Sequence, residues 1–379
     1  MSKTSRDPIY IDYNASTPIA PEVAAVMRRV MDEAFGNPSS PHWAGASARE
    51  IVEKARSQVA NLLGCAPGEI VFTSGGSEAN NFALKGMYFA SERPGKHIIT
   101  TQIEHPAILE PCRFLERLGA RITLLPVDRT GMIDPDDLRR AISADTILVS
   151  IMHANNETGT IQPVADCAAI AREHDIPLHT DAAQSAGKIP TRVDALGVDL
   201  LSIAGHKIYG PKGIGALYIR AGVMPEPLIH GAGHESGRRA GTESALLTAA
   251  LGEACHLAEN LADMIGTKAL RDRFWDALVT RFGDGVELNG HATARLPNTL
   301  NVSFAGRMGA DILAALDGVA ASTGSACHAD RIELSPVLAA MAVPPRIGMG
   351  AIRFSLGHGT TAAEIDDVAE RLTRTVEHA

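Results

Sequence analysis

Short apolar runs rich in β-branched residues recur along the first two thirds of the chain, and each ends in a polar or glycine-rich turn. Stretches with helical spacing of apolar residues lie between several of these runs. This alternation is typical of a parallel α/β sheet, because a crossover segment must join consecutive parallel strands. We therefore predict an α/β fold around a mostly parallel sheet of seven strands. The predicted strands span residues 69–73, 96–100, 121–125, 146–151, 176–180, 199–203 and 214–219, and helices are predicted at 22–33, 47–63 and 134–141.

The pattern changes after about Gly241. An alanine- and leucine-rich run over residues 244–282 predicts one extended helix. The rest of the chain predicts a smaller α+β unit, with strands at 298–304 and 351–356 and helices at 309–316 and 361–377. We expect two domains: a large one from residue 16 to residue 260, and a small one that combines residues 1–15 with residues 261–379.

Composition narrows the class of protein. The chain has 379 residues, of which 45% are hydrophobic and 21% charged, and these proportions exclude a collagen-like, disordered or coiled-coil protein. The formal net charge of −9 argues against a nucleic-acid or anionic-membrane surface, so we expect a small-molecule or protein partner. Neither a signal peptide nor an apolar run of membrane-spanning length is evident, and the expected location is the cytoplasm.

A glycine-rich turn follows the first predicted strand of the sheet. It reads Thr-Ser-Gly-Gly-Ser-Glu-Ala-Asn-Asn over residues 73–81 and leads into a helix. Free backbone N–H groups at a helix start, with a nearby hydroxyl, suit a phosphate group. The alternative is an ordinary turn in which Ser77 caps the helix.

Other polar residues follow later strands, at the edge where open parallel sheets bind ligands. They include His105, Asn156 and Asp181. Lys207 also ends a predicted buried strand, where desolvation would lower the pKa of its amine, as imine formation with an aldehyde requires. Together with the glycine-rich turn, these groups match the needs of pyridoxal phosphate: the lysine joins the aldehyde, the acid keeps the ring nitrogen protonated and the histidine covers the ring.

One cysteine stands apart from the others. The five cysteines are odd in number and lack metal-ligand spacing, which predicts a reducing compartment and no metal site. Cys327 lies in a segment of small residues, Ala-Ser-Thr-Gly-Ser-Ala-Cys-His-Ala-Asp, and we interpret it as an accessible nucleophile. The alternative is a loop cysteine without a catalytic role.

Ten motifs spread over nearly the whole chain carry a family resemblance. They are YIDYNASTP (10–18), FGNPSSPHWAG (35–45), FTSGGSEANN (72–81), EHPAI (104–108), HANNETG (153–159), HTDAAQSAGK (179–188), GHKIYGPKGIGALY (205–218), RRAGTES (238–244), STGSACHAD (322–330) and AIRFSLGHGTT (351–361). With these motifs the chain resembles the cysteine desulfurases, which are class V, fold-type I enzymes dependent on pyridoxal 5'-phosphate. The segment from Cys327 to Arg353 resembles the longer version found in desulfurases that serve iron–sulfur assembly and tRNA thiolation.

The resemblance implies a role for each matching residue around the cofactor. Lys207 would bind the cofactor covalently, Asp181 would face its ring nitrogen, and His105 would stack on the ring and act as an acid or base. The phosphate would be held by Gly76, Ser77 and His206, with Thr242 contributed by the neighbouring subunit of a homodimer, and the ring substituents would meet Asn156 and Gln184.

The resemblance also implies the substrate and its fate. Arg353, together with Asn14, would bind the carboxylate of L-cysteine, and Cys327 would take the sulfur as a persulfide for an acceptor or scaffold protein. One position departs from the pattern, since Ala204 stands where many relatives have a phosphate-binding serine. The loss of that hydrogen bond would weaken phosphate binding by about 0.5–1.5 kcal/mol.

Three alternatives stay open at this point. A selenocysteine lyase shares the YIDYNASTP motif, the Cys327 segment and the following LSPVL sequence at 334–338. An aminotransferase of the same fold would have no use for Cys327. A non-catalytic, cofactor-bound scaffold for sulfur transfer would show no effect of Cys327→Ala.

Overall fold

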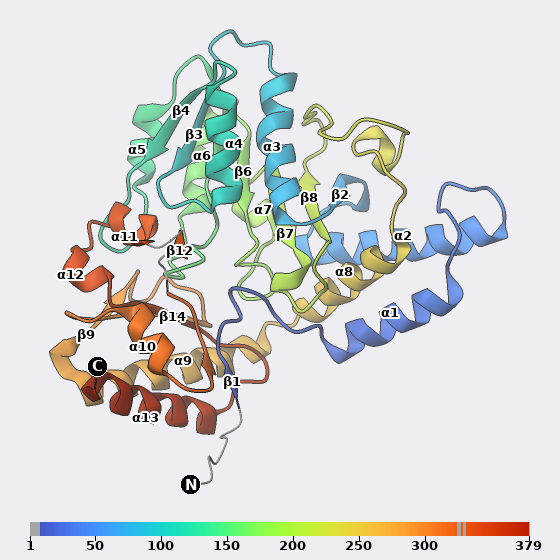
Figure 1. Ribbon diagram of the computed structural model, residues 1–379. Helices are drawn as coiled ribbons and strands as arrows, with labels where there is room; N and C mark the ends of the chain where they lie inside the picture. Colours follow the sequence, from blue (N-terminus) through green and yellow to red (C-terminus); the bar gives the residue numbers. More distant parts are fainter. Residues whose placement is uncertain (1–7, 324–326, 329–330, 379) are drawn as a thin grey trace.

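The computed structural model describes residues 8–323, 327–328 and 331–378, and for residues 327–328, 331–332 and 377–378 it describes the backbone alone. Its centre is a seven-stranded sheet (Figure 1). In sheet order the strands are β2 (Ile70–Thr73), β8 (Gly215–Ile219), β7 (Leu200–Ala204), β6 (Leu178–Asp181), β5 (Thr146–Ser150), β3 (His97–Thr101) and β4 (Arg121–Leu125). Only β8 runs against its neighbours, so the expectation of a mostly parallel seven-stranded sheet is confirmed.

Helices cover both faces of this sheet because alternate strand residues point to opposite sides. Val71 and Leu217 face a core that also contains residues of α3 (Gly76–Ala90) and α4 (Pro106–Glu116). Phe72 contributes to the core on the opposite face. That second face is covered by α1 (Pro21–Glu33), α2 (Trp43–Leu63), α5 (Pro135–Ala141), α6 (Val164–Glu173), α7 (Val193–Leu196) and α8 (Ala245–Ala258).

A separate hydrophobic core occupies the lower part of Figure 1. Here three antiparallel strands, in the order β14-β10-β9, pack with three helices and with the chain's first strand. The elements are β1 (Ile9–Tyr10), α9 (Ala262–Phe282), β9 (Val286–Asn289), β10 (Thr299–Phe304), α10 (Gly309–Ala315), β14 (Ala351–Ser355) and α13 (Ala362–His378). Shorter elements complete this part of the chain: β11 (Val319–Ala320), β12 (Cys327–His328), β13 (Arg331–Ile332), α11 (Pro336–Ala340) and α12 (Pro345–Gly348). Within the described residues, no helix combines the length and apolarity needed to cross a bilayer.

The single helix expected over residues 244–282 is wrong. The structure has two helices, α8 and α9, which are separated by Glu259, Asn260 and Leu261. The side-chain oxygen of Asn260 accepts the backbone N–H of Ala262 at 3.0 Å. Such a local bond offers the backbone an alternative to the helical pattern, so α9 begins anew after Asn260.

A buried ion pair fastens residues 229–244 to the edge of the large sheet. Arg56 on α2 donates two hydrogen bonds of 2.9 Å to the carboxylate of Glu235, which also accepts the backbone N–H of Phe72 in β2. The Arg56 and Glu235 side chains are 9% and 2% exposed. Because β2 leads directly into the glycine-rich turn, this pair holds residues 229–244 beside that turn.

Glu235→Ala is expected to lower the free energy of unfolding by about 3–5 kcal/mol, because it removes the buried counterion of Arg56 and leaves that charge only the exposed carboxylate of Glu53 at 3.3 Å. Denaturant unfolding followed by circular dichroism measures the change. Glu173→Ala is the matched control, since it removes an exposed carboxylate paired with Arg139 and should have a much smaller effect. Equal losses in the two variants would contradict the prediction.

Candidate active site

A cavity of about 550 Å³ lies beyond the carboxyl ends of β2, β6 and β7. Ten of the twelve residues that the sequence points to line it. They are Asn14, Gly76, Ser77, His105, Asn156, Asp181, Gln184, His206, Lys207 and Arg353. The other two are Thr242, which is exposed and is not among the lining residues, and Cys327, whose side chain lies outside the described part of the chain.

The glycine-rich turn gives the cavity an uncapped helix start. Gly75 precedes α3 with φ +149°, a conformation that favours glycine, and it supplies no side chain to cap the helix. The first backbone N–H groups of α3 therefore face the cavity without a capping side chain, and such groups attract an anion. Glu78 in this first turn is paired with Arg239 at 2.9 Å, which offsets its negative charge.

Ala204 closes the cavity opposite the start of α3. It is buried, and a Cβ atom added at Gly76 would lie 3.3 Å from the Ala204 Cβ. An alanine here offers no hydroxyl toward a phosphate, as the sequence indicated. His206 and Lys207, just beyond β7, supply the polar groups on this side of the cavity.

The amine of Lys207 has neutral hydrogen-bond partners and a lowered pKa. Its Nζ donates to the backbone carbonyls of Asn14 at 2.6 Å and Ala15 at 2.9 Å, and both partners are neutral. Burial, helped by the nearby Arg353 guanidinium, lowers the pKa of this amine to about 8, although the Asp181 and Asp12 carboxylates oppose the shift. A larger fraction of Lys207 than of an ordinary lysine is therefore uncharged, and so nucleophilic, near neutral pH.

Asp181 is held in place from two sides. Its Oδ2 accepts the side-chain amide of Asn80 at 2.7 Å, and its Oδ1 accepts the backbone N–H of Ala183 at 2.9 Å. Asn80 lies one turn into α3, four residues after Gly76. The same helix that presents free N–H groups thus also orients the buried acid.

Two histidines present neutral rings to the cavity. The Nδ1 of His105 accepts the backbone N–H of Ala107 at 3.0 Å, so the proton of the neutral ring resides on Nε2. Burial lowers the pKa of His105, an effect that Asp181 opposes and Lys207 reinforces. Burial, with Lys207 and Lys212 nearby, lowers the pKa of His206 to about 4.

A buried amide network supports the floor of the cavity. Gln184 donates to the carbonyl of Asn14 at 2.9 Å and accepts from the Nζ of Lys188 at 3.0 Å. Burial, with the Lys207 and Arg353 charges nearby, lowers the pKa of Lys188 to about 7. Lys188 and Lys207 also line a larger, mainly apolar cavity of about 790 Å³, which does not include Asp181 or the start of α3.

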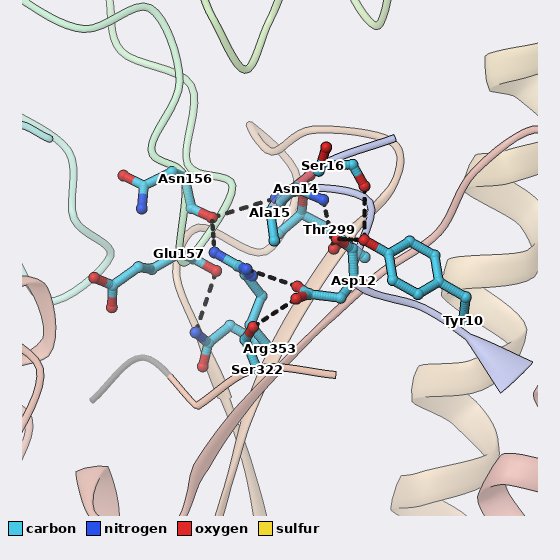
Figure 2. Close-up of polar contacts among 12 residues, drawn as sticks. Tyr10, Asp12, Asn14, Ala15, Ser16, Asn156, Glu157, Thr299, Ser322 and Arg353 are labelled. Atoms are coloured by element: carbon cyan, nitrogen blue, oxygen red, sulfur yellow. Dashed lines mark hydrogen bonds and ion pairs between the residues drawn. The ribbon is translucent and has the colours of Figure 1, made fainter. Parts of the chain in front are cut away.

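Arg353 in β14 also lines this cavity, and Figure 2 shows its polar contacts. Its Nη1 donates to the backbone carbonyl of Asn156 at 3.1 Å, and its Nη2 pairs with the Asp12 carboxylate at 2.7 Å. The same Asn156 carbonyl accepts the side-chain amide of Asn14 at 3.3 Å. Arg353, Asn14 and Asn156 therefore form one polar group at this cavity.

Comparisons with known proteins identify the family. The family model described as aminotransferase class-V matches residues 9–368. The chain belongs to this family. It is 51% identical to the cysteine desulfurase IscS of Dictyoglomus turgidum, with 97% of this chain and 94% of the relative covered, and 46% identical to IscS of Methanosarcina thermophila, with 99% and 93% covered. A solved structure titled NifS-like protein has a TM-score of 0.92 at 38% identity and covers 98% of this chain and 100% of its own.

The class-V family depends on pyridoxal 5'-phosphate, and the residues of this cavity fit that group. The uncapped start of α3 suits the phosphate, the amine of Lys207 suits the aldehyde, and the fixed carboxylate of Asp181 suits a protonated ring nitrogen. The carboxylate of Asp181, the amine of Lys207 and the anion site at the start of α3 therefore lie in one cavity, as the cofactor requires.

Sequence reasoning missed Asn80, which lines this cavity. It also missed three residues that contact lining residues: Asp12, Glu104 and Lys188. Two of them carried a local signal, because Asn80 lies one helical turn after Gly76 and Lys188 lies four residues after Gln184. Glu104 precedes His105 and is buried, and burial raises the pKa of its carboxyl to about 8. It accepts the backbone N–H of Met152 at 2.8 Å, so it ties the loop of His105 to the end of β5.

Proposed function

We propose that this chain is a cysteine desulfurase, which converts L-cysteine to L-alanine and carries the sulfur as a persulfide on Cys327. One observation carries the proposal: the amine of Lys207, the carboxylate of Asp181 and the guanidinium of Arg353 line a single cavity in a chain of the class-V family. A further solved structure, titled SspA in complex with cysteine, has a TM-score of 0.83 at 38% identity and supports cysteine as the ligand.

We also propose how this cavity would hold each part of the cofactor. We assign the phosphate to Gly76, Ser77 and His206, with Thr242 of a second copy, and the ring to His105, Asn156, Asp181 and Gln184. The assignment is supported by the cavity lining and by the exposed position of Thr242 away from its own cavity. Bound covalently to Lys207, pyridoxal phosphate supplies an electron-accepting ring for chemistry at the substrate α-carbon.

Arg353, Lys207 and Asp181 then have separate roles in the proposed reaction. Arg353 binds the substrate carboxylate and orients the α-carbon. When it is not joined to the cofactor, the amine of Lys207 takes the α-proton, because its lowered pKa leaves a share of it uncharged and able to act as a base. Asp181, fixed by Asn80, keeps the ring nitrogen protonated.

Sulfur transfer falls to Cys327. Its thiolate attacks the substrate sulfur, a sulfur–sulfur bond forms and the carbon–sulfur bond breaks. The electron pair of that bond stays with the carbon fragment, which takes up protons and leaves as L-alanine. The other thiols suit this step poorly, because burial raises the pKa of Cys65, Cys112 and Cys167 to about 12 and that of Cys255 as well.

We also infer a homodimer in the cytoplasm that passes its sulfur to an acceptor or scaffold protein of iron–sulfur assembly or tRNA thiolation. The exposed side chains of Phe35 and Trp43, in one of the sequence motifs, support an interface on the α1–α2 connection. The hydrophobic core around β9, β10 and β14 is separate from the cores on the two faces of the large sheet, which supports a division into domains at 16–260 and at 1–15 with 261–379.

The proposal is tested by incubating the cofactor-loaded chain with L-cysteine or L-selenocysteine. We expect L-alanine in amounts equal to the sulfur recovered as protein persulfide and sulfide, with L-cysteine as an efficient substrate. Efficient turnover of L-selenocysteine alone would identify a selenocysteine lyase instead. Formation of 3-mercaptopyruvate without alanine would favour an aminotransferase, and normal partner binding without turnover would favour a scaffold.

A further inference from the structure

Arg353 already has a carboxylate partner within its own chain. Its Nη2 donates to Asp12 Oδ1 at 2.7 Å, and the two side chains are 11% and 15% exposed. Figure 2 shows the guanidinium between the Asp12 carboxylate and the backbone carbonyl of Asn156. A substrate carboxylate that reaches Arg353 therefore meets a guanidinium that is already paired.

Asp12 keeps a fixed position even without this ion pair. Its Oδ2 accepts the hydroxyl of Ser322 at 2.8 Å, and its backbone carbonyl accepts the hydroxyl of Tyr10 at 3.0 Å. Ser322 in turn exchanges two backbone hydrogen bonds with Arg353, at 2.7 and 3.2 Å. Because these contacts hold Asp12 independently of the guanidinium, Asp12 can yield Arg353 to another anion and stay nearby.

A second acidic residue near Arg353, Glu157, does not pair with the guanidinium. Glu157 is half-buried and close enough for the Arg353 charge to influence its carboxyl, but that carboxyl accepts a hydrogen bond from Ser335. Among the described residues, Asp12 is the carboxylate paired with Arg353. A buried guanidinium that lost this partner would carry an uncompensated charge and would attract any small anion.

We propose that Asp12 is a specificity-determining residue, which occupies Arg353 as an internal carboxylate so that simple acids do not. An internal partner acts at a high effective concentration, which a free carboxylic acid at millimolar concentration does not match. An α-amino acid competes better because its amino group is held elsewhere in the same cavity. The inference rests on the proposed function, in which Arg353 binds the carboxylate of L-cysteine.

The test uses acetate as the probe on the cofactor-loaded chain, at constant ionic strength held with sodium chloride. In Asp12→Ala and Asp12→Asn, acetate should compete with L-cysteine, with an inhibition constant at least ~10-fold lower than in the unchanged chain. Acetate should also raise the thermal unfolding midpoint of both variants and leave that of the unchanged chain unaltered. Glu157→Gln removes a neighbouring acid without removing the pair, so it should behave like the unchanged chain.

Specific results would overturn the inference. It is wrong if both Asp12 variants fold, as judged by circular dichroism, and still ignore acetate. It is also wrong if Asp12→Ala combined with Arg353→Ala responds to acetate as Asp12→Ala does, because the anion would then bind elsewhere. The unfolding midpoint needs no turnover, so a chain without desulfurase activity still reports on Asp12.

Discussion

Lys207→Ala is expected to abolish alanine release, with a loss of at least about 10³-fold, because in the proposed mechanism the side chain is both the covalent anchor of the cofactor and the base. With a pKa of about 8, roughly one-tenth of the amine is uncharged at pH 7, against about one in 3,000 for an ordinary lysine. The measurements are alanine release and the visible absorbance that stays with the protein after desalting. Lys207→Arg should fail equally, since a guanidinium stays charged.

Lys212→Ala is the matched control for this prediction. Lys212 lines the same cavity but is exposed, and the variant should keep the cofactor absorbance. The pH dependence adds a second check: because only the uncharged amine adds to an aldehyde, cofactor uptake by the cofactor-free chain should accelerate with pH and level off above about 8. Retained absorbance in Lys207→Ala after desalting would exclude Lys207 as the anchor.

Cys327→Ala is expected to keep the cofactor absorbance and to lose the protein persulfide and nearly all alanine release. The reason is chemical, because the burial of Cys112, Cys167 and Cys255 disfavours their thiolates and leaves them unable to replace Cys327. Mass spectrometry of the protein after exposure to L-cysteine detects the persulfide and locates it.

Cys65→Ala is the control for Cys327→Ala, because Cys65 is the half-buried member of the four described free cysteines. It should form the persulfide at the normal rate. Full sulfur release by Cys327→Ala would refute the assignment of the nucleophile, and loss of the cofactor absorbance would show that the substitution acts through the fold instead.

The strands of the large sheet were predictable because each is a short β-branched run bounded by polar turns. The run from 146 to 151, for example, appears as β5 over Thr146–Ser150, buried along its whole length. The break between α8 and α9 was not predictable from apolar spacing. It depends on one side-chain bond from Asn260 to a backbone N–H, which leaves the periodicity on either side unchanged.

The cavity residues that lie at the ends of strands were predictable, because the carboxyl ends of parallel strands are where such sheets bind ligands. Asp181 is the last residue of β6 and Lys207 follows β7, and parallel strands bring their carboxyl ends to one edge. Asp12 was missed because its importance arises from a contact with Arg353 across 341 positions of sequence. Likewise, Asn80 donates a hydrogen bond to Asp181 across 101 positions of sequence. The spacing of residues within either segment therefore does not predict this contact.

The same distance along the chain has a consequence for biosynthesis. Translation produces Asp12 long before Arg353 in β14, because 341 positions separate the two residues. A nascent chain that has not yet reached β14 can contain the glycine-rich turn and Lys207, but it lacks Arg353. The ion pair, and with it the proposed binding of the substrate carboxylate, therefore forms only after the ribosome has synthesised β14.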